Sequence, residues 1–229
     1  MKIGGFQKFS LIDFPGKISA IIFTQGCNFR CPYCHNPELV DPQNFSDEIP
    51  EKEIFDFLKK RQGKLDAVCI TGGEPTLHLD LPEFLKKIKK MGYLIKLDTN
   101  GTNPDMLHQV ISEKLADYLA MDIKAPLAKY AVVAGKPVNQ YHIVRSIGMI
   151  ENSGLEYEFR STLVKHLISP EDVLKMGMML GPAKRYFLQK FVPGKTLDAE
   201  LNPLSGFSQE SLNLLVSKMQ GDFAEFVVR

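Results

Sequence analysis

Three cysteines lie close together on one loop, at Cys27, Cys31 and Cys34 in the sequence QGCNFRCPYCHNP. An ionised thiol is a soft, charged ligand that favours metals such as iron. Three thiolates on one short loop can each hold one corner of a four-iron cluster. The fourth iron then keeps an open position where a small molecule can bind. The spacing therefore predicts an iron-sulfur site that activates a bound molecule.

Two other interpretations of these cysteines remain open at this point: a zinc site and a set of buried free thiols. Zinc normally takes four protein ligands, and His35 could supply one, but it directly follows Cys34 and no second ligand pair appears later. The fourth cysteine, Cys69, lies between Val68 and Ile70 in an apolar stretch. We expect Cys69 to be a core residue and not a ligand.

Stretches typical of buried strands alternate along the chain with stretches typical of amphipathic helices. We expect strands at 17–25, 65–71, 93–101, 116–126, 155–164 and 183–192. We expect helices at 46–60, 81–90, 104–112, 139–152, 170–180 and 208–219. This repeat predicts right-handed βαβ units around a parallel sheet. A closed barrel needs eight such units, so about six predict a partial barrel that is open on one side.

Polar side chains follow each expected strand, and in α/β barrels the reactive groups gather at that end of the strands. In chain order they are the cysteine loop, Gly72-Gly73-Glu74, Asp98-Thr99-Asn100, Asp122 with Lys124, Arg160, and Gln189-Lys190. The sequence therefore predicts one mouth that combines a metal with several carboxylates and two or three cations.

Composition excludes several classes of protein. The 229 residues are 44% hydrophobic and 24% charged, which is ordinary for a globular protein and suits a single domain spanning 1–229. A net charge of +1 does not suggest a nucleic-acid partner. We see neither an apolar signal core nor a membrane span, and a few bunched cysteines do not form a disulfide scaffold. We expect a cytoplasmic protein.

Several motifs together carry a resemblance to a known family. Cys27, Cys31 and Cys34, with the aromatic Tyr33 before the last cysteine, resemble the signature of the radical S-adenosylmethionine (SAM) enzymes. GGEP at 72–75, DTNG at 98–101 and MDIK at 121–124 resemble the glycyl-radical activases. SLIDFPGK at 10–17, with the cysteine loop, is most similar to the activating enzymes of anaerobic ribonucleotide reductase.

The resemblance implies a partial (β/α)6 barrel of the radical SAM type, a 4Fe-4S cluster on the three cysteines, and SAM as cosubstrate. It implies no acid or base among the side chains, because the cluster and SAM carry the chemistry. It further implies a glycine in a partner enzyme, anaerobic ribonucleotide reductase, as the target, and an electron donor such as flavodoxin or ferredoxin. Alternatives are an activase of the pyruvate formate-lyase type, a small-molecule enzyme such as a 7-carboxy-7-deazaguanine synthase, and a non-catalytic iron-sulfur protein.

The resemblance also assigns SAM-binding residues, each of which has a plainer interpretation. The residues are Tyr33, Gly72, Gly73, Glu74, Asp98, Thr99, Asp122, Lys124 and Arg160. Gly72 and Gly73 could be an ordinary turn, the two aspartates strand-end caps, and Lys124 a surface lysine. The resemblance instead implies that the two aspartates lie near a monovalent cation and the methionine carboxylate. Arg160 is as consistent with a structural ion pair as with a ligand role. The plain interpretation of His166 is a surface residue.

Overall fold

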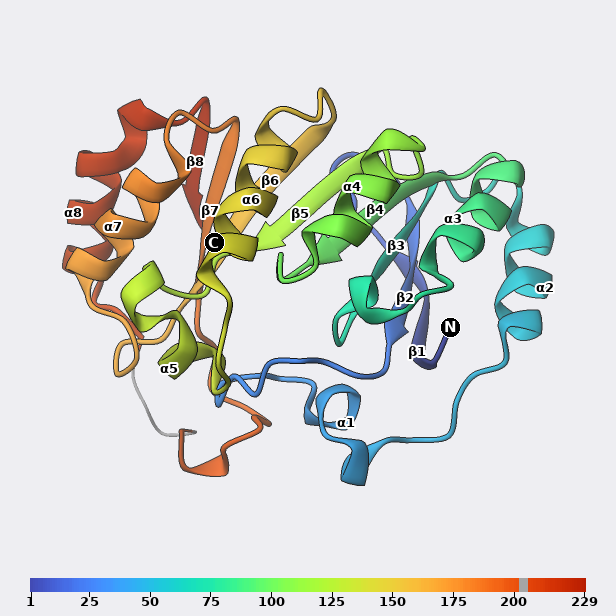
Figure 1. Cartoon of the computed structure of the whole chain (residues 1–229), viewed down its shortest axis with the longest axis horizontal. Helices are drawn as coiled ribbons and strands as arrows, with labels where there is room; N and C mark the ends of the chain where they lie inside the picture. The colour runs from blue at the N-terminus through green and yellow to red at the C-terminus, as the bar shows by residue number, and fades with distance from the viewer. Residues whose placement is uncertain (202–205) are drawn as a thin grey trace.

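The computed structural model describes residues 1–201 and 206–229, and its sheet has eight strands that lie side by side in chain order (Figure 1). β1 is antiparallel to β2, and β2 to β8 are parallel. The strands are β1 (Ile3–Ser10), β2 (Ser19–Thr24), β3 (Ala67–Gly72), β4 (Leu94–Thr99), β5 (Tyr118–Asp122), β6 (Glu156–Leu163), β7 (Arg185–Lys190) and β8 (Glu225–Val228).

Helices connect the parallel strands. The α-helices are α1 (Pro37–Val40), α2 (Glu51–Arg61), α3 (Leu81–Lys90), α4 (Pro104–Ser112), α5 (Tyr130–Ala134), α6 (Gln140–Glu151), α7 (Pro170–Leu180) and α8 (Gln209–Met219). Short 3-10 turns are η1 (Pro42–Asn44), η2 (Pro75–Leu77), η3 (Leu127–Lys129), η4 (Ala199–Leu201) and η5 (Gln220–Asp222). None of the helices in 1–201 and 206–229 is long and apolar enough to cross a membrane.

The six predicted strands are present as β2 to β7, so the expected parallel (β/α)6 unit is confirmed. The prediction did not include β1 and β8, which extend the sheet by one strand at each edge. The predicted helix 46–60 begins later, at Glu51, because Pro50 is its N-cap and the preceding backbone is not helical. The short helices α1 and α5 were not predicted.

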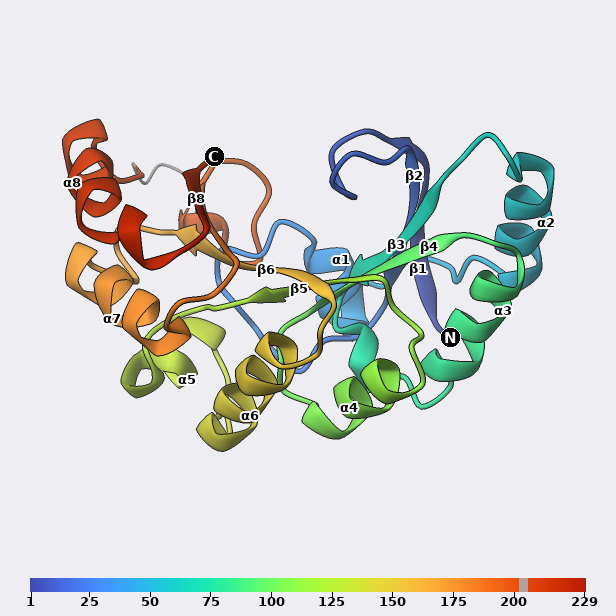
Figure 2. The same cartoon turned by 90° about the horizontal axis from the view of Figure 1, so that it is seen from above.

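The sheet curves into a half-pipe with the helices on its convex side (Figure 2). Side chains alternate between the two faces of a strand, so Ile22 packs with the helices in the main core while Ile21 faces the open side. On that concave side Ile21, Cys69 and Tyr118 belong to a small separate apolar cluster. Cys69 is 1% exposed, as expected for a core cysteine. Because β1 and β8 are the two edges of the described sheet, the barrel is not closed.

Candidate functional site

A cavity of about 240 Å³ lies at the C-terminal ends of the parallel strands. Eleven of the twelve residues predicted for the site line it: Cys27, Cys31, Tyr33, Cys34, Gly72, Gly73, Glu74, Asp98, Thr99, Asp122 and Lys124. Arg160 does not line the cavity but contacts two residues that do. Gln189 and Lys190 do not line it, and His166 is exposed at the surface.

All three loop cysteines carry free thiols that line this one cavity. Burial raises the pKa of each thiol, and for Cys27 the pKa reaches about 12. The nearby Lys124 ammonium acts in the opposite direction on Cys31 and Cys34. A thiol that resists ionisation by itself becomes a thiolate when a metal binds it. The three side chains are therefore suited to bind a metal centre rather than to act as free nucleophiles.

The donor set fits a polynuclear cluster better than a single zinc ion. Within residues 1–201 and 206–229, no three His, Cys, Asp or Glu side chains converge closely enough to hold one metal ion. Three thiols that share a cavity without converging suit a cluster, in which each cysteine binds a different iron. His35, the candidate zinc ligand, stacks on Phe191 with ring centroids 5.4 Å apart, and its Nδ1 lies 3.1 Å from the Lys195 carbonyl oxygen.

One buried hydroxyl in the cavity wall has no partner. Tyr33 is 4% exposed, and its Oη makes no hydrogen bond within the described protein. The Lys124 Nζ lies 6.0 Å from the centre of its ring. A buried hydroxyl is normally satisfied, so an orphaned one at a cavity fits a site that a bound group completes.

The carboxylate of Glu74 is fully enclosed by neutral donors. Oε1 accepts from the Thr76 N–H (3.1 Å), the Thr76 hydroxyl (2.5 Å) and the Thr99 hydroxyl (2.8 Å), while Oε2 accepts from the Asn100 N–H (2.6 Å). Glu74 is 1% exposed, and burial raises its pKa in spite of these bonds. Its carboxylate therefore ties the end of β3 to the end of β4.

The two glycines before Glu74 allow backbone to approach backbone. Gly72 has a φ of +109°, which favours glycine. A Cβ on Gly73 would lie 2.1 Å from the Gly26 carbonyl oxygen, far inside contact distance. The Glu74 N–H donates to that same oxygen at 2.8 Å. The GGEP loop is thus locked against the start of the cysteine loop.

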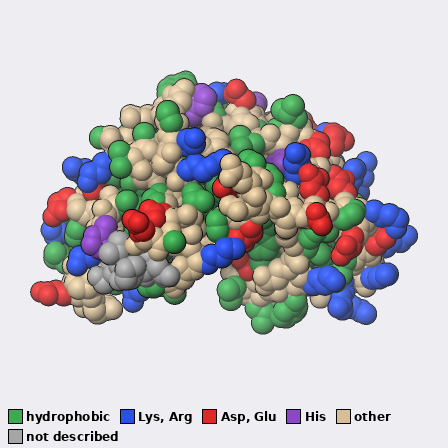
Figure 3. All heavy atoms as spheres, turned by 90° about the horizontal axis from the view of Figure 1, so that it is seen from below, with side chains coloured by type: hydrophobic (Ala, Val, Ile, Leu, Met, Phe, Trp, Pro, Cys, Tyr) green, Lys and Arg blue, Asp and Glu red, His purple; other side chains and the backbone are tan. Residues whose placement is uncertain are grey.

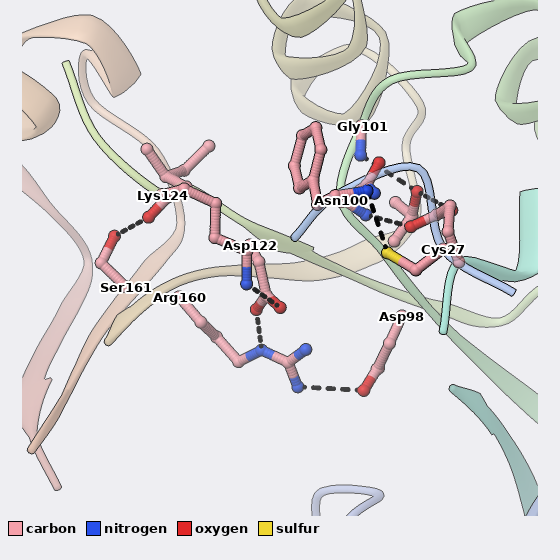
Figure 4. A network of polar contacts seen from close by, with 12 residues as sticks. Cys27, Asp98, Asn100, Gly101, Asp122, Lys124, Arg160 and Ser161 are labelled. Carbon is pink, nitrogen blue, oxygen red and sulfur yellow. Dashed lines mark hydrogen bonds and ion pairs between the residues drawn. The ribbon is translucent and has the colours of Figure 1, made fainter. Parts of the chain in front are cut away.

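A network of charges occupies the other side of the cavity (Figure 4). The Arg160 guanidinium bridges two strands, with its Nε 2.9 Å from Asp122 and its Nη1 3.1 Å from Asp98. The Lys124 Nζ lies 3.0 Å from the second Asp122 oxygen, and the Lys96 Nζ lies 2.6 Å from the second Asp98 oxygen. Each carboxylate oxygen keeps room for a second partner, because an ionised oxygen accepts about two hydrogen bonds.

The cations in this network keep the aspartates ionised. Burial alone would raise the pKa of Asp122, but Arg160 and Lys124 hold it well below its ordinary value. Burial is likewise outweighed at Asp98, where Arg160 and Lys96 lower the pKa. Burial opposes the charge of Lys124, yet Asp122 raises the Lys124 pKa well above its ordinary value. Of the two interpretations of Arg160, the structural ion pair is present, with Asp98 and Asp122 as partners, and it joins the ends of β4, β5 and β6.

Two contacts around the cysteine loop were not predicted from the sequence. The Asn100 side-chain amide donates to Asn28 at 2.9 Å, joining the β4 end to the loop. The second contact is made by residues 191–201, which follow β7 and which we call the strap. The Leu197 N–H donates to the Cys34 carbonyl and the Asp198 N–H to the Pro32 carbonyl, both at 2.9 Å. Only the NG turn at 100–101 gave a clue to the first contact.

Comparison with known proteins gives consistent matches. Residues 21–176 match the profile of the Radical SAM superfamily. The chain is 34% identical over 211 residues to a protein of Methanocaldococcus jannaschii named as a glycyl-radical enzyme activating enzyme, covering 88% of this chain and 85% of that protein. It is 29% identical to the pyruvate formate-lyase-activating enzyme of Staphylococcus epidermidis, covering 75% of this chain and 72% of that enzyme.

Solved structures agree on the fold. SuiB of Streptococcus suis, crystallised with S-adenosylmethionine, superposes with a TM-score of 0.69 at 13% identity over 91% of this chain. The chain spans about half of SuiB, 49% of its length. A domain of a pyruvate-formate lyase-activating enzyme from Bacteroides vulgatus gives a TM-score of 0.57 at 17% identity, over 72% of this chain and 99% of that domain.

Proposed function

Because this chain belongs to the radical SAM superfamily, as a relative of the glycyl-radical enzyme activating enzymes, we propose that it installs a glycyl radical on anaerobic ribonucleotide reductase. Enzymes of this family use a 4Fe-4S cluster and SAM. The observation that carries the choice of reductase is the motif SLIDFPGK at 10–17 together with FTQGCNFRCPYCHNP, which is most similar to the reductase-activating branch.

When bound, the cluster and SAM would supply the radical chemistry: one-electron reductive cleavage of the SAM sulfonium, with the electron coming from the external donor, and removal of a hydrogen atom from the target glycine. Cys27, Cys31 and Cys34 would hold the cluster as thiolates. Thr99 and Glu74 fix the β3 and β4 ends beside them. The fixed loops would hold the reacting groups in place.

The charged side of the cavity would hold the methionine part of SAM. Lys124 supplies a cation for its carboxylate, and Arg160 keeps that lysine's partner, Asp122, in place. Gly72 and Gly73 line the same cavity, and their carbonyl groups would accept from its ammonium group. Asp98 and Asp122 retain acceptor capacity for a ribose hydroxyl or for the monovalent cation that the resemblance implies. Tyr33 and Phe29 line the same cavity and would shield it from solvent.

An anaerobic assay tests this function. The purified protein is reconstituted with iron and sulfide, reduced with dithionite and given SAM, with and without the reductase. We expect four irons per chain, release of 5′-deoxyadenosine, and a glycyl-radical signal in electron paramagnetic resonance when the reductase is present. Zinc in place of iron, or intact SAM, would overturn the radical SAM assignment for this chain.

A pyruvate formate-lyase is the second candidate target. The 29% identity to an activating enzyme of that lyase, over 72% of the enzyme's length, supports it. Running the same assay with pyruvate formate-lyase separates the two candidates. If SAM is cleaved and the glycyl radical forms only on the lyase, then the lyase and not the reductase is the target. The rest of the proposal would stand.

A further inference from the structure

A buried lysine on the concave face of the sheet has no role in the function described so far. Lys96 lies on β4, two residues before Asp98, and its side chain is 3% exposed. Lysine is almost never fully buried unless it is ion-paired. Its Nζ lies 2.6 Å from Asp98 Oδ1 and 5.9 Å from the centre of the Tyr118 ring. Residues two apart in a strand share a face, so the Lys96 ammonium supports Asp98 from inside the half-pipe.

A buried carboxylate holds the arginine of the charge network in a similar way. Glu158 lies on β6, and its side chain is 3% exposed. Its Oε2 accepts a hydrogen bond from the Tyr118 hydroxyl at 2.8 Å, and its Oε1 lies 3.8 Å from the Arg160 Nη1. The same guanidinium bridges Asp98 and Asp122 (Figure 4). Arg160 is therefore fixed between three carboxylates.

Ion pairs join three cationic and three anionic side chains into one network. All four carboxylate oxygens of Asp98 and Asp122 contact a cationic nitrogen, at 2.6 to 3.1 Å. Among the residues that the structure describes, no other charged side chain pairs with the network. Since an uncompensated charge at a buried position is costly, this balance stabilises the site. The members are Lys96, Asp98, Asp122, Lys124, Glu158 and Arg160.

The network has an accessible side and an enclosed side. The surface is hollowed between two lobes, and acidic and basic side chains lie near the hollow (Figure 3). The Asp122 and Lys124 side chains are 30% and 16% exposed, and both line the cavity. Lys96 and Glu158 are buried and do not line it. A ligand in the cavity therefore meets Asp122 and Lys124, while Lys96 stays paired with Asp98 underneath.

We propose that Lys96 is a tethered cation that positions Asp98, so that SAM binds here without an inorganic monovalent cation. The resemblance implies such a cation near the two aspartates, but its charge would exceed the balance that the protein already provides. The remaining lone pairs of Asp98 and Asp122 would then accept from neutral donors such as a ribose hydroxyl. This inference rests on the proposed function only in that SAM occupies the cavity, and it does not depend on which enzyme receives the radical.

Exchange of the monovalent cation in the buffer tests the proposal. Lys96→Met removes the charge and keeps a side chain of similar length, whereas Lys96→Arg keeps the charge. Lys89→Met is the matched control, because Lys89 pairs with Asp117 outside the cavity, with its Nζ 2.7 Å from Oδ1. Potassium chloride is compared with choline chloride at equal ionic strength, because choline is too large to replace potassium among carboxylates. The measurements are the SAM affinity of the cluster-loaded enzyme and the melting temperature of the cluster-free protein.

We expect the parent and Lys96→Arg to bind SAM equally well in the two salts. Lys96→Met should bind SAM about tenfold more weakly in choline chloride, the effect of losing one charged contact, and potassium should restore part of that loss. Potassium should also raise the melting temperature of cluster-free Lys96→Met by about 2–4 °C, because it binds beside Asp98 in the folded state. Lys89→Met should respond to the two salts as the parent does.

A parent protein that needs potassium for full SAM affinity would overturn this inference and leave the proposed function standing. Normal SAM affinity of Lys96→Met in choline chloride would also overturn it, as would a loss of affinity that potassium does not restore. If Lys96→Met does not fold, the parent and Lys96→Arg in the two salts decide by the same criterion. If the cluster-loaded parent binds no SAM in either salt, the proposed function fails and this inference fails with it.

Discussion

Two sets of carboxylates lie at the same edge of the sheet but are held in different ways. Glu74 is 1% exposed and accepts hydrogen bonds only from neutral groups on its own and the neighbouring strand end. The side chains of Asp98 and Asp122 are 15% and 30% exposed and contact cations. The first set fixes the loops around the cysteines, whereas the second can exchange a protein partner for a ligand.

The largest effect is expected on iron binding, when one cysteine of the loop beside Glu74 is removed. Cys31→Ala should abolish iron binding after anaerobic reconstitution, because only two thiolates of the loop remain. Cys69→Ala, in the apolar cluster of the concave face, should keep the full iron content. Iron and sulfide analysis with the visible absorption spectrum measures both. Loss of iron in the Cys69 variant would mean that the ligand set is wrong.

Glu74→Gln should destabilise the protein even before a cluster is bound. The glutamine NH2 group would face a hydrogen-bond donor, either the Thr76 and Thr99 groups or the Asn100 N–H. One buried polar group would therefore lose its hydrogen-bond partner. That costs about 2 kcal/mol, which in a chain of this size lowers the melting temperature by roughly 4–8 °C.

Thermal unfolding of the metal-free variant checks this expectation, and hydrogen exchange of the Asn100 amide reports on the contact itself. Glu113→Gln, at the exposed end of α4, is the control and should change neither. A normal melting temperature with weakened SAM binding would instead make Glu74 a direct ligand, and the contrast between the two sets of carboxylates would disappear.

On the charged side, Lys124→Met should weaken SAM binding about tenfold, the effect of losing one moderately strong charged contact. Lys190→Met is the control, since Lys190 lies at the end of β7 but does not line the cavity. Equilibrium binding of SAM to the cluster-loaded variants measures the difference. Equal affinities would exclude a carboxylate contact at Lys124.

The smallest expected effect is the change of folding stability with pH, and its sign differs between Glu74 and the two aspartates. The pKa of Glu74 is raised, so the folded state binds its proton more readily, and this group adds stability as the pH falls toward 4.5. The pKa values of Asp98 and Asp122 are lowered, so their contribution is full above pH 3.8 and is lost below it.

Urea denaturation of the metal-free protein across this range measures both contributions. Arg160→Gln should raise the pKa of both aspartates and shift the acid loss of stability to higher pH. If the variant loses stability at the same low pH as the parent, Arg160 does not hold the aspartates ionised.

The sequence predicted the elements and residues that have strong local signals. The parallel strands carry long apolar runs, and the motifs at their ends gave eleven of the cavity residues. β8 has four residues and α5 has five, which is too short for a periodic pattern. The role of the Glu74 side chain depends on Thr99 and Asn100 of another strand, and such long-range contacts leave no local trace. The strap likewise contacts the cysteine loop through backbone groups, which any sequence provides.

The strap has a consequence for how the protein is made. Its hydrogen bonds to the cysteine loop join positions about 160 residues apart in the chain. On a ribosome that adds about 5–20 residues per second, the loop emerges roughly 10–30 seconds before the strap that secures it. During that interval the thiols are accessible to oxidants and to stray metals. Cluster assembly on a nascent chain would therefore be premature, and delivery of iron and sulfide should follow release.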